Sequence, residues 1–158
     1  MRIRTARPSE ASAVAALISL AYRVEDFFKV GDRTDETEVL ALMRKSAFLV
    51  MEDDNEALMA SVYVDVRGDT GYFGMLSVDP VRQGHGLGAR LVQAAEEYCR
   101  DAGCRAMEID VVNLRTELPE FYRRFGYAEA GTRPFTAGEE TKLPCHYIVM
   151  TKVLAAGA

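Results

Sequence analysis

The chain has 158 residues, of which 49% are apolar, and a formal net charge of −5. That length fits one domain with its own hydrophobic core, and the acidic balance argues against a general nucleic-acid binder, which carries a basic domain or stripe. Because no stretch approaches the ~20 apolar residues of a membrane span and no long apolar leader opens the chain, we expect a cytoplasmic protein that binds neither membrane nor nucleic acid.

The first third of the chain predicts a short strand and two helices. Residues 2–6 have strand character, and Pro8 opens a helix because proline suits a first helical turn. The apolar residues expected on the buried face of that helix are Ala13, Leu17, Leu20 and Ala21. Further on, Asp35 and Glu38 have the spacing of a capping box, which predicts the start of a second short helix.

The middle of the chain changes to the alternating pattern of strands. Residues 48–51 and 57–64 read as strands around a turn at 53–56. A second turn, at 67–71, leads into a third strand over 72–78. Three consecutive strands with short turns predict an antiparallel meander.

A helix and the remaining strands follow the meander. Residues 87–102 have helical periodicity, and Gly103 stands where a helix C-terminus favours a left-handed residue. The apolar alternation over 107–112 completes a strand–helix–strand unit, which implies a right-handed parallel crossover. Three more elements end the chain: a short helix over 116–124 and two strands, one from Tyr127 onward and one over 145–153.

These elements predict an α+β fold, with about seven strands in one mixed, mostly antiparallel sheet flanked by about four helices. No repeat, linker or low-complexity tract divides the chain, so we assign residues 1–154 to a single domain. We expect residues 155–158 to form a frayed tail.

The cysteines and histidines do not predict a metal site. Cys99, Cys104 and Cys145 lack CxxC spacing, and only His85 and His146 could join them. A zinc cluster needs four such ligands at characteristic spacings. We therefore expect no bound metal, and thiols that stay reduced.

Three alternating glycines, Gly84, Gly86 and Gly88, stand between the third meander strand and the next helix. Their backbone can approach a ligand closely and adopt positive φ. The first helical turn adds unpaired N–H groups and the positive end of a dipole, which together bind anions. Since a tight turn alone needs one or two glycines, the pattern predicts a pyrophosphate site over residues 83–89.

Two nucleotide-binding alternatives compete for this loop. It lacks Gly-Lys-Ser/Thr, which disfavours a nucleotide-hydrolysing P-loop. Gly84, Gly86 and Ala89 formally satisfy a dinucleotide fingerprint, with Glu108 and Asp110 about 20 residues further on. However, several residues separate the strand from the first glycine, the motif follows a meander, and too little chain remains for a doubly wound sheet. An NAD(P)-dependent oxidoreductase is therefore our third hypothesis.

Two motifs resemble one known family. Residues 76–88, Leu-Ser-Val-Asp-Pro-x-x-Gln-Gly-His-Gly-Leu-Gly, are similar to the acetyl-CoA motif of the GNAT superfamily of N-acetyltransferases. Its core, Gln/Arg-x-x-Gly-x-Gly/Ala, is met by Gln83, Gly86 and Gly88. Residues 121–127, Phe-Tyr-Arg-Arg-Phe-Gly-Tyr, are similar to the family's Leu-Tyr-x-x-x-Gly-Phe segment. The element order matches as well, so the resemblance covers essentially the whole chain and implies a GNAT-like fold with splayed fourth and fifth strands.

The resemblance implies acetyl-CoA as cofactor and gives roles to the motif residues. Backbone groups of Leu76, Ser77 and Val78 would bind the pantetheine arm like an added strand. The pyrophosphate would lie on backbone N–H groups of the loop and helix start: Gln83, Gly84, His85, Gly86, Leu87, Gly88 and Ala89. Asn113 would hydrogen-bond the pantetheine, although the family's usual asparagine position holds Arg115.

By the same resemblance, a primary amine attacks the acetyl thioester directly and Tyr122 is the general acid. A phenol with a reference pKa of ~10 can donate a proton to a departing thiolate whose conjugate acid has a pKa of ~8.5. A backbone N–H near Val78 would stabilise the oxyanion. A non-catalytic acyl-CoA-binding or sensor module on the same scaffold is the second hypothesis, and Tyr122 favours the enzyme.

The sequence predicts neither the general base nor the acceptor. The strand position where some relatives place a glutamate reads Tyr72-Phe73-Gly74. Four other carboxylates are candidates, and each is expected to be exposed to solvent: Glu25, Asp26, Glu108 and Asp110. Of these, Glu25 and Asp26 could instead select a cationic acceptor. Segments 22–38 and 135–143 should shape a pocket for a small amine, an amino acid, an antibiotic, a peptide or a protein amine. The resemblance also allows a homodimer.

Overall fold

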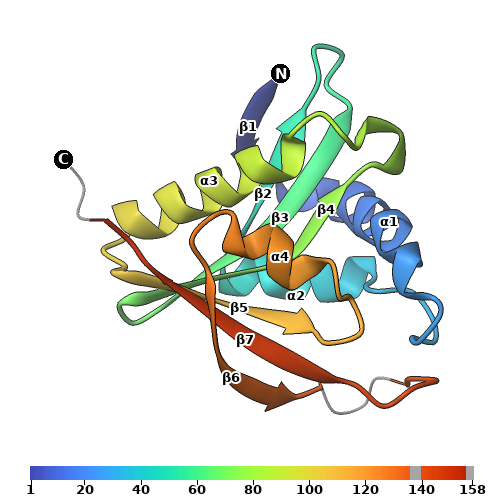
Figure 1. Ribbon diagram of the computed structural model, residues 1–158. Helices are drawn as coiled ribbons and strands as arrows, with labels where there is room; N and C mark the ends of the chain where they lie inside the picture. The colour runs from blue at the N-terminus through green and yellow to red at the C-terminus, as the bar shows by residue number, and fades with distance from the viewer. Residues whose placement is uncertain (136–139, 156–158) are drawn as a thin grey trace.

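The structure, a computed structural model, describes residues 1–135 and 140–155. Its seven strands form one sheet in the order β1-β2-β3-β4-β5-β7-β6 (Figure 1). The strands are β1 (Arg2–Thr5), β2 (Ala47–Glu52), β3 (Leu58–Arg67), β4 (Thr70–Val78), β5 (Ala106–Val112), β6 (Ala128–Pro134) and β7 (His146–Val153). Only β4 and β5 run parallel, and every other neighbouring pair is antiparallel. The predicted α+β fold with a meander and one parallel crossover is confirmed.

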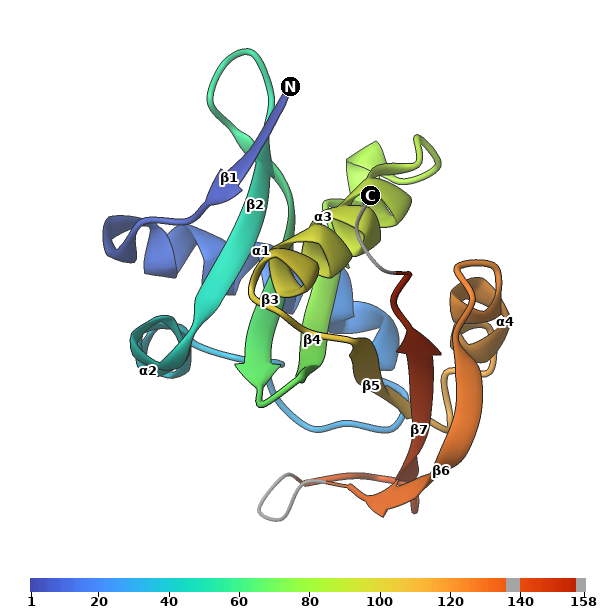
Figure 2. The ribbon, with the colours of Figure 1, turned by 90° about the vertical axis from the view of Figure 1, so that its left-hand side faces the viewer.

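Four α-helices cover the sheet, two on each face (Figure 2). They are α1 (Ala11–Ala21), α2 (Glu36–Lys45), α3 (Leu87–Asp101) and α4 (Leu118–Arg123), with short 3₁₀ helices η1 (Pro8–Glu10), η2 (Tyr22–Glu25) and η3 (Pro80–Arg82). Alternate β2 residues point to the two faces: Phe48 and Val50 pack with α1 and α2, whereas Leu49 and Met51 pack with α3 and α4. All six residues of β2 are therefore buried, although it lies second from the edge of the sheet.

The N-terminal helices show what the sequence pattern could and could not predict. Asp35 caps α2, because its carboxylate accepts a hydrogen bond from the Glu38 backbone N–H at 2.8 Å, as predicted. The predicted buried face of α1 is partly wrong: Ala13 and Leu20 are exposed, and Val14 and Ile18 pack inward beside the predicted Leu17. Because α1 is apolar almost all round, the sequence pattern marks no single face.

The parallel strands β4 and β5 separate soon after they meet. They pair only over residues 70–72 and 106–108. On the opposite side, the register of β4 with β3 slips between Gly74 and Ser77, and Met75 in this bulge has a φ of 53°. A bulge bends a strand, and a positive φ is strained for a residue with a side chain. The edge of β4 beyond Tyr72 therefore has no strand partner on the side of β5, which confirms the predicted splay.

Some expectations fall on residues outside those described. These are residues 136–139 of the predicted acceptor loop and residues 156–158 of the predicted tail. Within the described part of the chain, no helix is both long enough and apolar enough to cross a membrane.

Candidate active site

A cleft of about 530 Å³ opens beside the glycine loop, and we name it the loop cleft. It lies between the end of β4, the start of α3 and the helix α4. Most of the predicted site residues line it: Leu76, Val78, Gln83, Gly84, Gly86, Leu87, Gly88, Ala89 and Tyr122. Segments far apart in the chain thus meet where the sequence predicted a single site.

The glycine loop presents bare main chain to this cleft. Gly84 and Gly86 have φ values of 86° and 74°, and Gly86 is the N-cap of α3. A Cβ added at either glycine would meet no atom within 4 Å. Between residues 83 and 89, no backbone N–H donates a hydrogen bond to another described residue. Together with the helix dipole, these free amides give the surface a positive partial charge, which favours an anion.

Three predicted residues do not line the loop cleft. The buried Ser77 hydroxyl donates a hydrogen bond to the Met75 carbonyl at 2.9 Å, on the strand face opposite Leu76. His85 is exposed on another side of the loop. The Asn113 side-chain oxygen accepts a hydrogen bond from the His146 backbone N–H at 2.9 Å, which extends the pairing of β5 with β7. The backbone roles of Ser77 and His85, and the cofactor role of Asn113, stay predictions.

Tyr122 projects from α4 into an aromatic cluster. Its ring centroid lies 5.0 Å from that of Phe121 and 5.8 Å from that of Phe73. Burial raises the pKa of the Tyr122 phenol far above its usual value, and the nearby Tyr22 adds to the effect. No described residue shares a hydrogen bond with its hydroxyl. The phenol is therefore a protonated donor available to a ligand.

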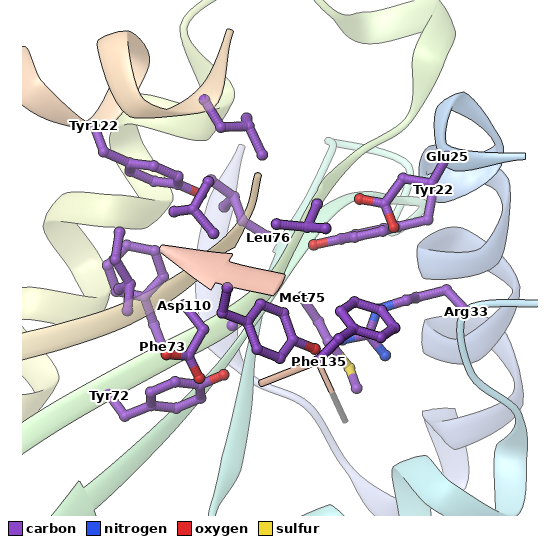
Figure 3. Close-up of a pocket in the computed structure, with 16 residues that line it drawn as sticks. Tyr22, Glu25, Arg33, Tyr72, Phe73, Met75, Leu76, Asp110, Tyr122 and Phe135 are labelled. Atoms are coloured by element: carbon purple, nitrogen blue, oxygen red, sulfur yellow. The ribbon is translucent and has the colours of Figure 1, made fainter. Parts of the chain in front are cut away.

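A second, smaller cavity of about 70 Å³ fills the gap between the splayed strands, and we name it the strand pocket (Figure 3). Four residues line both cavities: Tyr22, Leu76, Leu118 and Tyr122. Since a water molecule needs ~10–15 Å³ on this measure, the strand pocket holds roughly five to seven water-sized groups. The two cavities therefore meet at these four side chains.

Aromatic and charged side chains from several elements line the strand pocket. The aromatic residues are Tyr22, Tyr72, Phe73, Tyr122, Phe135 and Tyr147, and the charged ones are Glu25, Arg33 and Asp110. Figure 3 shows Tyr22 and Glu25 on one side of Leu76 and Tyr122 on the other. The segments predicted to shape an acceptor pocket thus supply Tyr22, Glu25, Arg33 and Phe135.

The expectation that Glu25 is a solvated loop charge is wrong. Glu25 is only 6% exposed, and its carboxylate accepts a hydrogen bond from Arg115 at 3.0 Å. Burial raises the pKa of Glu25, and the charge of Arg115 opposes that rise. Its neighbour Asp26 is exposed, as expected. The turn of η2 points one carboxylate inward and the next outward.

The expected exposed face of β5 is also partly wrong. Arg133 of β6 donates to Glu108 and to Asp110, at 2.6 Å each, and the Asp110 side chain is only 14% exposed. These hydrogen bonds raise the pKa of Arg133. The Arg133 side chain reaches across β7 to this face of β5, which sequence spacing does not show. Both carboxylates accept a hydrogen bond from Arg133, so neither is available as the acidic residue of a dinucleotide site.

The sequence reasoning assigned no role to several residues of the loop cleft, including Leu118 and Phe121. A Cβ built on Gly88 would lie 3.7 Å from Phe121 Cζ, so α4 packs closely on the start of α3. The position of Phe121 beside Tyr122 in the motif is the one sequence signal that could have found it. Leu118 carries no such signal, because only the fold brings it to the cleft, and Tyr22 was expected in the acceptor pocket but not in the loop cleft as well.

Comparisons with known proteins bear on this site. A family model described as the acetyltransferase (GNAT) family matches residues 16–127. No curated protein matches the chain. Among solved structures, the chain is similar to the ribosomal-protein-S18-alanine N-acetyltransferase from Escherichia coli, with 16% identity over 99% of this chain and 96% of that one and a TM-score of 0.75.

Two similar structures were solved with a ligand. One is yncA from Salmonella typhimurium with acetyl-CoA, with 19% identity over 100% of this chain and 96% of that one and a TM-score of 0.74. The other is Rv2747 from Mycobacterium tuberculosis with CoA and NLQ, with 18% identity over 98% of this chain and 100% of that one and a TM-score of 0.69. Identities this low show a shared fold. The family model, in contrast, matches more than half of the sequence, including the glycine loop and Tyr122, and the chain therefore belongs to the GNAT family of acetyltransferases.

Proposed function

We propose that this protein is an N-acetyltransferase that binds acetyl-CoA in the loop cleft and acetylates a primary amine in the strand pocket. The observation that carries the proposal is the junction of the two cavities at Leu76 and Tyr122. A transferase needs a donor site and an acceptor site that share one reacting point, with a proton donor beside it. Residues 1–154 would act as one catalytic domain.

The residues of the loop cleft fit a coenzyme A molecule. The unpaired N–H groups of residues 83–89 would hold the pyrophosphate. The free edge of β4 at residues 76–78 offers backbone groups to the pantetheine amides, and Val78, Phe121 and Phe125 supply apolar contact. Bound acetyl-CoA would supply a thioester whose carbonyl carbon accepts the amine nitrogen.

Tyr122 would hold the proton that the leaving sulfur needs. Its raised pKa keeps the hydroxyl protonated at neutral pH, and no described residue shares a hydrogen bond with it. A backbone N–H near Val78, on the unpaired edge of β4, would stabilise the developing oxyanion. Tyr122 lies at the junction of the cavities and Val78 lines the loop cleft two residues from Leu76 of that junction, which supports direct transfer without a covalent enzyme intermediate.

The strand pocket supports a small amine, or the slender end of a larger one, as acceptor. Its volume admits few heavy atoms, and its aromatic walls attract cations. Glu25 and Asp110 add negative charge within it. Whether the amine belongs to a small molecule, a peptide or a protein would depend on contacts outside the pocket.

The test is calorimetry with coenzyme A, followed by a thiol-release assay with acetyl-CoA and a panel of amines. We expect coenzyme A to bind and at least one primary amine to release free thiol. Binding without release for every amine would favour the non-catalytic module. Tight binding of NAD(P)H with no binding of coenzyme A would favour the oxidoreductase.

A further inference from the structure

A buried ion pair stands where the loop cleft and the strand pocket meet. Arg115, on the connection between β5 and α4, donates to the Glu25 carboxylate of η2 at 3.0 Å. Their side chains are only 19% and 8% exposed. Taking two charges out of water is costly, and their attraction only partly offsets that cost. A buried pair is therefore weak evidence for stability, and a pair in a reaction cleft suggests a function.

The two partners face different cavities. Arg115 lines the loop cleft, and Glu25 lines the strand pocket. A second carboxylate, Glu117, accepts a hydrogen bond from Arg115 Nε and is 61% exposed. The hydrogen bond from Arg115 is the contact that keeps the Glu25 carboxylate in place beside Tyr22, whereas the bond to the exposed Glu117 lies outside the pocket (Figure 3).

We propose that Glu25 binds the acceptor as a primary aliphatic ammonium ion and takes its proton, with Arg115 as the residue that positions Glu25. The inference deepens the proposed acetyl transfer and rests on it. One N–H bond of the ammonium breaks, its proton passes to a Glu25 oxygen, and the nitrogen keeps the electron pair for attack. The Glu25 carboxylic acid then returns the proton to water.

The position of Glu25 fits this role better than that of Asp110. Asp110 lies beside Tyr72, which lines the strand pocket but not the loop cleft, and is held by Arg133 (Figure 3). Glu25 lies next to Tyr22, which lines both cavities. A nitrogen held by Glu25 is therefore close to the point where the two cavities join.

Burial and nearby charges act in opposite directions on the basicity of Glu25. Its pKa is raised by burial, while three cations oppose the rise: Arg115 of the β5–α4 connection, and Arg33 and Lys29 of its own segment. The other titratable groups lining the pocket are Tyr22, Tyr72, Asp110, Tyr122 and Tyr147. A general base works best when its pKa lies near the operating pH. Because the reactive carboxylate is lost as pH falls through this raised pKa, activity should fall at a higher pH than an ordinary glutamate would allow.

The experiment compares Glu25→Gln with the matched control Glu117→Gln, which removes the other carboxylate on the same arginine. Thiol release is measured from pH 5 to 9 with ethylamine and with trifluoroethylamine, which has a similar shape but is uncharged at neutral pH. We expect Glu25→Gln to lower kcat about 100-fold with ethylamine, the size of a general-base contribution, and to replace the acidic limb set by Glu25 with a rate that keeps rising up to pH 9 as the free amine becomes more abundant. With trifluoroethylamine the loss should be small, because that amine carries no extra proton. Glu117→Gln should resemble the wild type.

Each other outcome has a defined meaning. An equal loss with both amines, or an equal loss in both variants, would assign Glu25 a structural role and overturn the inference. Wild-type transfer with an unchanged Glu25→Gln profile would overturn it while leaving the proposed function intact. No transfer by the wild type to any amine would instead overturn the proposed function. If Glu25→Gln fails to bind coenzyme A, the pH profile of thiol release is measured for Glu25→Asp instead. Because aspartate keeps a carboxylate at this position, a profile without an acidic limb would count against the inference.

Discussion

The loop cleft and the strand pocket meet at Tyr122, yet they are built in opposite ways. The anion-binding part of the loop cleft is main chain from the consecutive residues 83–89. The strand pocket is made of side chains from η2, β4, β5, α4 and β7, which the fold brings together from distant parts of the chain. One site is a local motif, and the other exists only in the folded molecule.

This difference predicts how each site responds to substitution. A main-chain site depends on backbone conformation, and only the glycines that permit it matter. A side-chain pocket depends on individual groups, each with its own pKa and partners. Changes in the loop should therefore act on cofactor affinity, and changes around the strand pocket on catalysis.

The largest effect is expected at the junction of the two sites. Tyr122→Phe should lower kcat about 10²- to 10⁴-fold, because the leaving sulfur loses its proton donor. Coenzyme A affinity should stay the same, since the hydroxyl has no part in holding the pyrophosphate. Steady-state kinetics and calorimetry measure the two quantities.

A matched tyrosine tests whether the effect belongs to the phenol of Tyr122. Tyr127 packs against Tyr122, but its hydroxyl donates to Glu96 at 2.8 Å, away from both cavities. Tyr127→Phe should lower the free energy of unfolding by ~1–3 kcal/mol and leave kcat near the wild-type value. If the two variants lose activity equally, aromatic packing and not proton donation explains the loss.

A smaller effect is expected from Gly86→Ala, which alters the loop cleft. The added methyl group would meet no atom within 4 Å, but the backbone of a residue with a side chain is strained at a φ of 74°. Coenzyme A affinity should fall by about tenfold or more, which is about 1.4 kcal/mol of binding free energy. Calorimetry checks this value, and kcat at saturating acetyl-CoA should change little.

Gly68→Ala is the control for that strain. Gly68 has a φ of 66° in the turn between β3 and β4, with no atom within 4 Å of an added Cβ. Both variants should lose ~1–2 kcal/mol of stability, the usual penalty of a left-handed residue with a side chain. Weaker coenzyme A binding in Gly68→Ala as well would show that strain, and not the exposed amides, governs affinity.

The smallest effect on function is expected far from both sites. Arg4 donates to both oxygens of Glu10 at 2.8 Å, and these hydrogen bonds lower the Glu10 pKa from 4.5 to about 2. Because the folded-state pKa is depressed, this stabilisation is complete above pH 4.5 and is lost as pH falls toward 2. Glu10→Gln should lose ~1–3 kcal/mol at pH 7, less at pH 3, and keep both coenzyme A affinity and kcat. Urea unfolding at the two pH values tests it, and a loss of the same size at both would refute the linkage.

The sequence by itself determined the order of the elements and the main-chain site. Alternating and helical periodicities predicted the meander and the crossover, while Asp35 and Gly103 marked helix ends through local chemistry. The glycine loop could be interpreted for the same reason: its geometry and its ligand depend on consecutive residues. Its resemblance to one family then supplied a role for Tyr122.

The tertiary structure alone decided which charges are buried and which side chains meet. Glu25 and Arg115 are 90 residues apart, so neither the burial of that carboxylate nor its partner follows from local pattern. The same holds for Asp110, which β6 covers with Arg133. Burial and pairing depend on contacts between distant segments, and a pKa depends on both. The chemistry of the acceptor side therefore emerges only when the chain has folded.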